Sequence, residues 1–242
     1  MADMGQPAMR GVEVLEGIER AIVVCAHADD METMMGGTAA LLADGGVELF
    51  ELICTRGDLG SQDAGISRDS LAATRLEEAR LGAEMLGFRE VAVLEHHDGE
   101  LVAGLELRAQ VAQYYRLWQP DTLFTFDADW AGQIHPDHRA AGRAAIDALI
   151  PSRMPAYHPK QLQMAAVGRV SRAYLFSPAG AALAVDVTEV YDRKVSACLA
   201  HASQFPNGEG ALDWMRKLDS ESAAQAGEGG RLYERFAEVR LW

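Results

Sequence analysis

The sequence predicts an α/β protein with a Rossmann-like fold, in which a mostly parallel sheet carries helices on both faces. Short apolar segments alternate along the chain with segments whose apolar residues recur every three or four positions, which is typical of strand–helix–strand units. The first apolar segment, residues 21–26, suits a strand buried on both faces. No internal repeat, low-complexity tract or linker divides the 242 residues, so we expect one domain over residues 1–242.

Three strand–helix pairs are expected in the first half of the chain. The predicted strands are residues 21–26, 47–54 and 91–94. The helices that follow them carry apolar faces within residues 34–41, 72–86 and 107–118. Ser70 is the expected N-cap of the second helix, and Gly87 ends that helix. Residues 55–69 form a glycine-containing loop of unusual length, which indicates a functional role.

The second half of the chain continues the alternation less regularly. Further strands are predicted at residues 122–126, 173–176 and 183–185. One helix is predicted over residues 138–149, and the apolar positions between residues 187 and 202 share the face of another. Residues 151–168 contain three prolines and are expected to form an irregular connection.

Composition and charge exclude several classes of protein. Lys and Arg total 22 against 36 Asp and Glu, a formal net charge of −14, which argues against nucleic acid or an anionic membrane as the main partner. The three cysteines are far apart and form no CxxC pair, which excludes a disulfide framework and a cysteine-rich zinc site. No apolar run approaches the roughly 18 residues of a membrane span, and no signal peptide is visible. We therefore expect a soluble, cytoplasmic protein that acts on a small molecule.

Two clusters of histidine and aspartate each follow a predicted strand. His27, Asp29 and Asp30 come directly after residues 21–26, and the sequence His135-Pro136-Asp137-His138 follows residues 122–126 after a short loop. Parallel strands bring such turns to the same end of the sheet, where ligands bind in folds of this kind. Two histidine nitrogens and one carboxylate oxygen would then form a three-ligand metal site with an open position, typical of catalytic zinc and also suited to iron(II).

These clusters and several other segments resemble the LmbE/PIG-L family of zinc-dependent N-deacetylases. The resemblance is carried by His27-Ala28-Asp29-Asp30-Met31-Glu32 with the following Gly36-Gly37-Thr38, and by His135-Pro136-Asp137-His138. Further similar segments are Thr55-Arg56-Gly57-Asp58-Leu59-Gly60-Ser61, Asp98-Gly99-Glu100-Leu101 and His201-Ala202-Ser203-Gln204-Phe205. The resemblance extends from about residue 21 to residue 205, and it is strongest to the diacetylchitobiose-deacetylase-like and thiol-sugar-deacetylase-like branches.

The resemblance implies a role for each residue of the two clusters. The ligands of Zn²⁺ would be His27, Asp30 and His138. Asp29 would be the general base that acts on the metal-bound water, and His135 would polarise or protonate the developing oxyanion. An amide is a poor electrophile, so its hydrolysis at neutral pH needs an activated water, a base within hydrogen-bond reach and a fixed partner for the oxyanion.

On the substrate side, Arg75 and Asp98 match positions that hold sugar hydroxyls in members of the family. The chain departs from the family pattern at two places: Ala28 stands where many members have proline, and Gln133 stands where some have a tyrosine that assists the oxyanion. Trp130, in the loop before His135, is the aromatic residue expected nearest the substrate.

The leading hypothesis is a zinc-dependent hydrolase that removes an acetyl group from an N-acetylated amino sugar or sugar conjugate, such as an N-acetylglucosamine-type compound. One alternative is a non-haem iron(II) oxygenase, because the spacing of His27 and Asp29 also occurs in such sites, although those enzymes commonly use an all-β barrel. Another is a non-catalytic sugar-binding relative, which would be expected to have lost a ligand or the base. Members of the family often assemble, so the hypotheses include a homo-oligomer.

Overall fold

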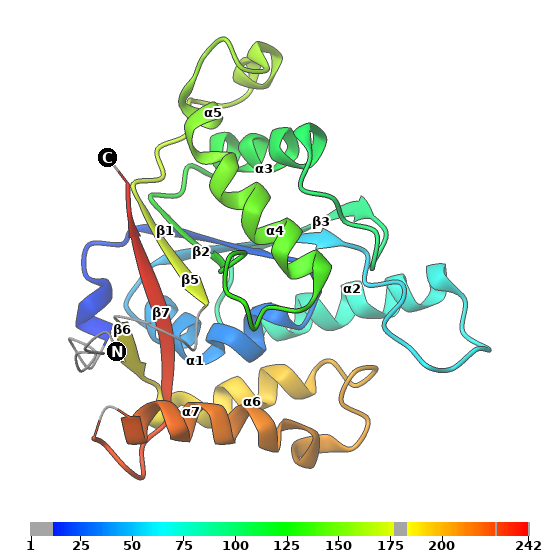
Figure 1. The fold of residues 1–242 in the computed structure, drawn as a ribbon, viewed down its shortest axis with the longest axis vertical. Helices are drawn as coiled ribbons and strands as arrows, with labels where there is room; N and C mark the ends of the chain where they lie inside the picture. Colours follow the sequence, from blue (N-terminus) through cyan, green and yellow to red (C-terminus); the bar gives the residue numbers. More distant parts are fainter. Residues whose placement is uncertain (1–11, 177–182, 226, 242) are drawn as a thin grey trace.

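The computed structural model describes residues 12–176, 183–225 and 227–241, and these contain a seven-stranded sheet (Figure 1). The strands, in spatial order, are β3 (Glu90–His96), β2 (Glu48–Thr55), β1 (Arg20–Cys25), β4 (Thr122–Phe126), β5 (Arg172–Phe176), β7 (Tyr233–Arg240) and β6 (Leu183–Asp186). The first five in this order run parallel to one another, and β7 is antiparallel to both of its neighbours. The predicted α/β fold with a mostly parallel sheet is confirmed.

Helices cover both faces of the sheet, as predicted (Figure 1). One face carries α3 (Leu105–Trp118), α4 (Pro136–Asp147) and the short α5 (Leu149–Arg153). The other carries α1 (Asp30–Asp44), α2 (Arg68–Met85), α6 (Tyr191–Leu199) and α7 (Asp213–Gln225). Helix α6 packs across both α1 and α2, and α7 packs against the edge formed by β7 and β6. Short 3₁₀ turns occupy residues 12–15, 159–163, 188–190 and 208–212.

The centre of the sheet is the parallel pair β1 and β4, which positions the site. Val24 of β1 stands beside Thr125 of β4 in the register, and both strands are almost completely buried. The predicted strand buried on both faces is therefore confirmed. Because the two strands are parallel and each ends one residue after this pair, the chain leaves both of them at the same edge of the sheet.

Strand β7 and helix α7 were not predicted from the sequence. Residues 233–240 contain four charged side chains in irregular order, and one of them, Glu234, is buried. Its carboxylate accepts hydrogen bonds from the backbone N–H groups of Gly37 (3.0 Å) and Thr38 (2.7 Å) in α1. A carboxylate satisfied in this way can enter the interior, so polarity alone does not exclude a buried strand.

Lys194, the polar residue on the predicted apolar face of α6, is completely buried. Its ammonium group lies 2.8 Å from Asp219 of α7 and 2.8 Å from Glu234 of β7. Burial alone lowers the pKa of an ammonium group, but the two carboxylates hold the pKa of Lys194 above its usual value. The charged form therefore persists and connects α6, α7 and β7.

Helix α2 begins earlier than expected, and the prediction of Ser70 as its N-cap is wrong. The capping residue is Ser67, which has extended backbone angles (φ −78°, ψ 149°) and accepts a hydrogen bond from the N–H of Ser70 at 3.1 Å. Serines at both positions made the choice ambiguous in the sequence. Gly87 follows the helix with φ +86°, as expected of a residue that ends a helix.

Among the helices of the described residues, none combines the length and the apolar character that crossing a membrane would require.

Glu51 of β2 is fully buried, and neither of its carboxyl oxygens has a hydrogen-bond partner among the described residues. Burial raises the pKa of Glu51 well above its usual value, and the neighbouring carboxyls of Glu32, Asp30 and Asp29 raise it further. The neutral acid is therefore the stable form of this side chain in the folded protein.

We predict that Glu51→Gln increases the stability of the protein relative to wild type, and increasingly so as the pH rises from 5 to 8. The pKa of Glu51 is higher in the folded protein than in the unfolded chain, so above the unfolded pKa the side chain binds a proton when the protein folds. The free energy of unfolding of the wild type therefore falls as the pH rises, by up to about 1.4 kcal/mol per pH unit. The glutamine has no proton to take up. Urea unfolding at several pH values measures the difference.

The control for this series is Glu84→Gln, which changes an exposed acid of α2. Its unfolding free energy should follow that of the wild type at every pH. A difference between Glu51→Gln and wild type that does not change with pH would show that Glu51 is ionised in both the folded and the unfolded protein.

Candidate active site

The turn between β1 and α1 is closed by the side chain of Asp30. Its Oδ2 accepts hydrogen bonds from the backbone N–H groups of Ala26 (3.0 Å) and His27 (2.8 Å). This leaves Oδ1 directed at His138, 3.1 Å from its Nε2. Asp29 is the N-cap residue of α1, but its side chain makes no capping hydrogen bond and is available for other contacts.

The second cluster lies at the start of α4. His135 is the N-cap residue, Pro136 is the first residue of the helix, and His138 is the third. The imidazole of His138 stacks on Phe126 at the end of β4, with ring centroids 4.0 Å apart and planes 9° apart. Gln133 Oε1 lies 3.1 Å from Nδ1 of His138. Stacking and hydrogen bonding therefore fix both the position and the orientation of this ring.

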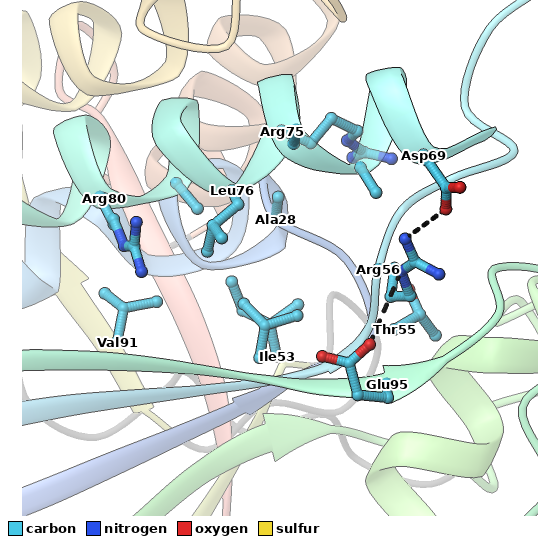
Figure 2. A pocket seen from close by; sticks show the side chains of 14 residues that line it. Ala28, Ile53, Thr55, Arg56, Asp69, Arg75, Leu76, Arg80, Val91 and Glu95 are labelled. Atoms are coloured by element: carbon cyan, nitrogen blue, oxygen red, sulfur yellow. Dashed lines mark hydrogen bonds and ion pairs between the residues drawn. The ribbon is translucent and has the colours of Figure 1, made fainter. Parts of the chain in front are cut away.

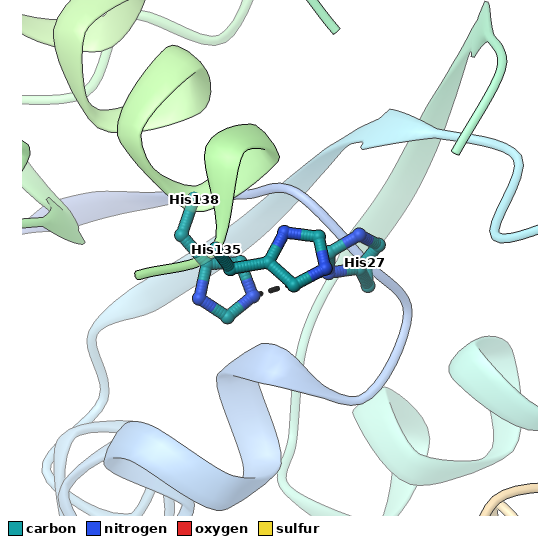
Figure 3. A group of neighbouring side chains, drawn as sticks. All are labelled: His27, His135 and His138. Carbon is teal, nitrogen blue, oxygen red and sulfur yellow. Dashed lines mark hydrogen bonds between the residues drawn. The ribbon is translucent and has the colours of Figure 1, made fainter. Parts of the chain in front are cut away.

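The two clusters converge, as expected from parallel strand ends. Nδ1 of His27 lies 3.1 Å from Nε2 of His138, and Asp30 lies 3.6 Å from the first and 3.1 Å from the second of these nitrogens. Figure 3 shows the rings of His27, His135 and His138 meeting between the N-terminus of α4 and the turn after β1. The structure therefore brings His27, Asp30 and His138 together at the carboxyl ends of β1 and β4.

The outer nitrogens of the two rings have oxygen partners. Nε2 of His27 lies 3.2 Å from Asp98 and 3.4 Å from Asp137, while Nδ1 of His138 faces Gln133. When each outer nitrogen donates its proton to an oxygen, the inner nitrogens present lone pairs to the same point as Asp30 Oδ1. Two imidazole nitrogens and one carboxylate oxygen make a donor set that fits a divalent ion such as zinc.

The charges around His27 favour a cation. Burial alone would lower the pKa of this imidazole, but the surrounding carboxylates of Asp30, Asp137 and Asp98 raise the pKa of His27 to about 12. Conversely, and against the effect of burial, His138 and His27 hold the pKa of Asp30 well below its usual value. The site therefore carries an excess of negative charge that a proton or a metal ion can balance.

His135 differs from the other two histidines. Its Nδ1 accepts a hydrogen bond from the backbone N–H of Asp137 at 3.2 Å, so the proton of the neutral ring is on Nε2. Burial and the nearby rings of His27 and His138 lower the pKa of His135, which keeps it neutral. Distance alone would allow a metal between His27, His135 and His138, but this tautomer makes His135 a hydrogen-bond donor instead.

Distance also groups His27 with Asp98 and Asp137. The oxygens of Asp137 already accept hydrogen bonds from the backbone N–H groups of Gly99 (2.6 Å) and Leu101 (3.2 Å). Both carboxylates approach Nε2 of His27, the nitrogen that faces away from His138. They are therefore placed to orient His27 rather than to form a separate metal site.

Arg75 is nearly fully buried, with 3% of its surface exposed, and lies between the carboxylates of Asp29 and Asp98. One guanidinium nitrogen lies 2.6 Å from Asp29 Oδ1, and the other lies 3.7 Å from Asp98 Oδ2 and donates to the carbonyl of Gly57 at 3.2 Å. Because Asp29 pairs with Arg75 and Asp30 faces the imidazoles, the geometry disfavours the iron(II) oxygenase alternative, which depends on Asp29 as a ligand.

All seven site residues predicted from the sequence line one open cavity of about 340 Å³, a volume within the range of small-molecule sites. The remaining wall includes Met34, Gln204, Phe205 and Trp214, of which the sequence analysis did not identify Trp214 as a site residue. Trp130, expected near the substrate, is not among the lining residues, and its indole packs over Gly132.

Several buried contacts fix the wall of this cavity. Asp58 accepts a hydrogen bond from the backbone N–H of Asp98 at 2.9 Å, and, against the effect of burial, Arg68 and this bond lower the pKa of Asp58 to about 2. On the opposite side, the fully buried Glu32 and His201 lie 3.0 Å apart. These contacts hold the loop after β2 and the segment after α6, neither of which could be placed from sequence periodicity.

A second cavity of about 300 Å³ lies between α2 and strands β2 and β3 (Figure 2). Its lining includes the apolar side chains of Leu76 on the α2 side and of Ile53 and Val91 on the strand side, and Arg56 at one end pairs with Asp69 and Glu95. No histidine is among its lining residues. The acid–base groups are therefore concentrated in the other cavity.

Together, the α/β sheet and a histidine–aspartate set at the carboxyl ends of its strands define a candidate active site with the donor atoms that a catalytic metal ion needs. The chain belongs to the PIG-L family, whose model, described as GlcNAc-PI de-N-acetylase, matches residues 22–149, more than half of the chain. It is a deacetylase, that is, an amide hydrolase.

Individual relatives agree with this membership. The chain is 30% identical over 198 residues to diacetylchitobiose deacetylase from Thermococcus kodakarensis, covering 80% of this chain and 73% of the relative. The structure of N,N'-diacetylchitobiose deacetylase from Pyrococcus horikoshii superposes with a TM-score of 0.87 at 28% identity, covering 99% of this chain and 88% of that one.

The same fold also occurs with another chemistry. GalB, a 4-carboxy-2-hydroxymuconate hydratase from Pseudomonas putida, superposes with a TM-score of 0.76 at 23% identity, covering 93% of this chain and 97% of that one. Similarity at this level shows the fold alone. The fold therefore does not identify the substrate or the roles of the residues, which must be argued from the site itself.

We predict that Gly142→Ala destabilises the protein and displaces His138. A Cβ at position 142 of α4 would collide with the backbone carbonyl of Phe126, the residue on which His138 stacks. The helix must move away from β4, at a cost of roughly 1–3 kcal/mol that outweighs the gain of about 1 kcal/mol in helix propensity. Chemical unfolding measures the loss of stability.

Gly210→Ala is the matched control, since a Cβ there meets nothing within 4 Å. We expect its stability to stay within about 0.5 kcal/mol of the wild type. Equal stability of the two variants would mean that α4 can shift without cost, and the contact with Phe126 would then not position His138.

Proposed function

We propose that this chain is a zinc-dependent hydrolase that removes the acetyl group from an N-acetylated amino sugar or sugar conjugate, such as an N-acetylglucosamine-type compound. The observation that carries the proposal is the convergence of two imidazole nitrogens and one carboxylate oxygen beside Asp29 and His135. The two diacetylchitobiose deacetylases among the similar proteins support the choice of an N-acetyl sugar as substrate.

In this proposal His27, Asp30 and His138 hold the zinc ion. When bound, zinc lowers the pKa of a water molecule to roughly 7 and polarises the amide carbonyl. The oxygen partners behind the two imidazoles would keep their lone pairs directed at the ion, since groups that orient a ligand typically change metal affinity by about 10- to 100-fold. Asp30 is held in turn by two backbone N–H groups.

Asp29 is the general base of the proposed reaction. Its carboxylate lines the cavity and is free of the helix-capping role that its position would otherwise give it. The ion pair with Arg75 holds Oδ1 in place, and a general base needs such a fixed position within reach of the proton that it accepts. Asp29 accepts the proton of the attacking water and then donates it to the nitrogen of the leaving amine, which breaks the amide bond and leaves acetate and the free amino sugar.

His135 stabilises the oxyanion that develops on the carbonyl oxygen. A neutral ring with its proton on Nε2 is a hydrogen-bond donor towards the cavity, and it stays neutral because its pKa is lowered. Such a donor, fixed before the reaction, is typically worth about 3 kcal/mol in the transition state. Gln133, which stands where some members of the family have a tyrosine, is engaged with His138, so in this proposal the donor to the oxyanion is His135.

Arg75 and Asp98 are the proposed contacts to sugar hydroxyls. Both line the cavity, and both are largely buried, so a hydroxyl group that reached them would lie in a site with little water. Each would serve a second purpose, since Arg75 also holds Asp29 and Asp98 also faces His27. Binding of the sugar and orientation of the catalytic groups would therefore be coupled.

We predict that Asp29→Asn lowers kcat by about 10²- to 10⁴-fold, the range of general acid–base catalysis, while the zinc content stays at the wild-type level. The amide keeps the shape of the side chain but cannot accept the proton. Release of free amine from N-acetylglucosamine and from N,N'-diacetylchitobiose, together with elemental analysis, measures both properties.

The control is Asp63→Asn, which changes an acid of the exposed loop after β2. Its kcat and metal content should equal those of the wild type. If Asp29→Asn were to retain more than about a tenth of the wild-type kcat, another group would have to be the base.

We predict that Asp30→Ala and His138→Ala each lose bound zinc, and that a chelator abolishes and added Zn²⁺ restores the release of amine by the wild type. Each variant removes one of the three converging donors. Metal stoichiometry of the purified proteins, with Co²⁺, Mn²⁺ and Fe²⁺ measured beside zinc, identifies the ion.

His96→Ala provides the control, because His96 contacts Gln110 and lies outside the cavity lining. It should bind metal as the wild type does. Full metal occupancy in both Asp30→Ala and His138→Ala would place the ion elsewhere, and the proposed function would then fail together with the proposed ligand set.

A further inference from the structure

The wall of the catalytic cavity beyond the histidines and aspartates includes three large apolar side chains, Met34, Phe205 and Trp214. Met34 and Phe205 are partly buried and pack against the hydrophobic core, which accounts for their presence. Trp214 is different: half of its surface is exposed, and it is not among the side chains that pack against the core. The fold therefore gives no reason for an indole at this position.

The position of Trp214 is nevertheless fixed by its neighbours in the chain. Leu212 and Met215, on either side of it, are buried, and the sulfur of Met215 lies 3.9 Å from that of Cys198 in α6. The guanidinium of Arg216 lies over the ring of Tyr191, 4.9 Å from its centroid. These contacts prevent the first turn of α7 from rotating about the helix axis, which keeps the Trp214 side chain at the wall of the cavity.

Exposure locates Trp214 at the mouth of the cavity. His27 and Asp30 at the inner end are each 7% exposed, while Trp214 is 50% exposed. When the acetamide group of a substrate lies at the inner end, the sugar ring that carries it lies beside the buried Arg75 and Asp98. Trp214 is farther from the inner end. The group beside the indole is one that follows the reacting sugar along the substrate.

The chemistry of the indole indicates what that group is. The face of an aromatic ring carries partial negative charge and attracts C–H groups, and one face of a pyranose ring presents several C–H groups. The charged side chains that line this cavity belong to the inner cluster, and Trp214, Phe205 and Met34 stand among the uncharged lining residues. An uncharged sugar ring fits this wall better than a phosphate or a carboxylate.

We propose that Trp214 is a specificity-determining residue that stacks on the sugar ring next to the N-acetylated one, so that the enzyme prefers a disaccharide or longer substrate to a monosaccharide. The proposal rests on the proposed function for the identity of the reacting sugar. It adds a binding position to that site, formed by α7, an element that contributes none of the proposed catalytic residues.

The test compares the kinetics of wild type, Trp214→Ala and Trp214→Phe on N-acetylglucosamine, N,N'-diacetylchitobiose and N,N',N''-triacetylchitotriose. In Trp214→Ala the KM for the disaccharide should rise relative to the KM for the monosaccharide by about tenfold, the change expected for loss of one stacked ring. The fall in kcat should be smaller than the rise in KM. Trp214→Phe should restore most of the preference, since it restores an aromatic face.

The matched control is Trp130→Phe, which changes the other partly exposed tryptophan of the described residues without touching the cavity. In this variant the ratio of the KM for the disaccharide to the KM for the monosaccharide should equal that of the wild type. The melting temperatures of all variants should agree closely. An unchanged ratio in Trp214→Ala, with acetate still released from these sugars, would overturn the proposal while the proposed function stands.

A second measurement separates the two proposals when no sugar is hydrolysed. N,N',N''-triacetylchitotriose is titrated into the purified, metal-containing protein, and tryptophan fluorescence is followed. Quenching in the wild type that is absent in Trp214→Phe and present in Trp130→Phe would support stacking on Trp214 even if the proposed reaction failed. Absence of quenching in the wild type would overturn the stacking.

Discussion

The parallel pairing of β1 with β4 is the constraint on which the site depends. Neither cluster contains a complete donor set, because His27 and Asp30 follow one strand and His138 follows the other. The two strands are separated by about a hundred residues of chain but are neighbours in the sheet, so their carboxyl ends bring the halves together. A sheet in which these strands were antiparallel would place the two clusters at opposite edges.

Charge balance gives this arrangement its chemical character. Three carboxylates surround His27, and a buried group of like charges is stable only when cations compensate it. Arg75 supplies one fixed positive charge between Asp29 and Asp98. The converging donors of His27, Asp30 and His138 could bind a second positive charge, either a proton or a metal ion. In an acidic protein the affinity for a cation thus arises locally, from the order of the side chains rather than from the net charge.

Much of this could be predicted from the sequence, and the failures have physical causes. The strand pattern and the spacing of His27 with Asp30 predicted the sheet edge at which the residues meet, because both are local signals. Strand β7 was missed because its buried charge, Glu234, finds its partners in distant segments. Trp214 was missed, and Trp130 favoured instead, because nearness in the chain to His135 was a poor guide to nearness in space.

Strand β7 also has a consequence for the order in which the molecule assembles. It is the last strand of the described chain, yet it lies between β5 and β6 and not at an edge. During synthesis β6 therefore leaves the ribosome before β7, its partner in the described part of the sheet, has been made, and about fifty more residues must follow before the two can pair. The parallel half of the sheet can form early, whereas closure of the far half is a late, long-range event that a truncation near the C-terminus would prevent.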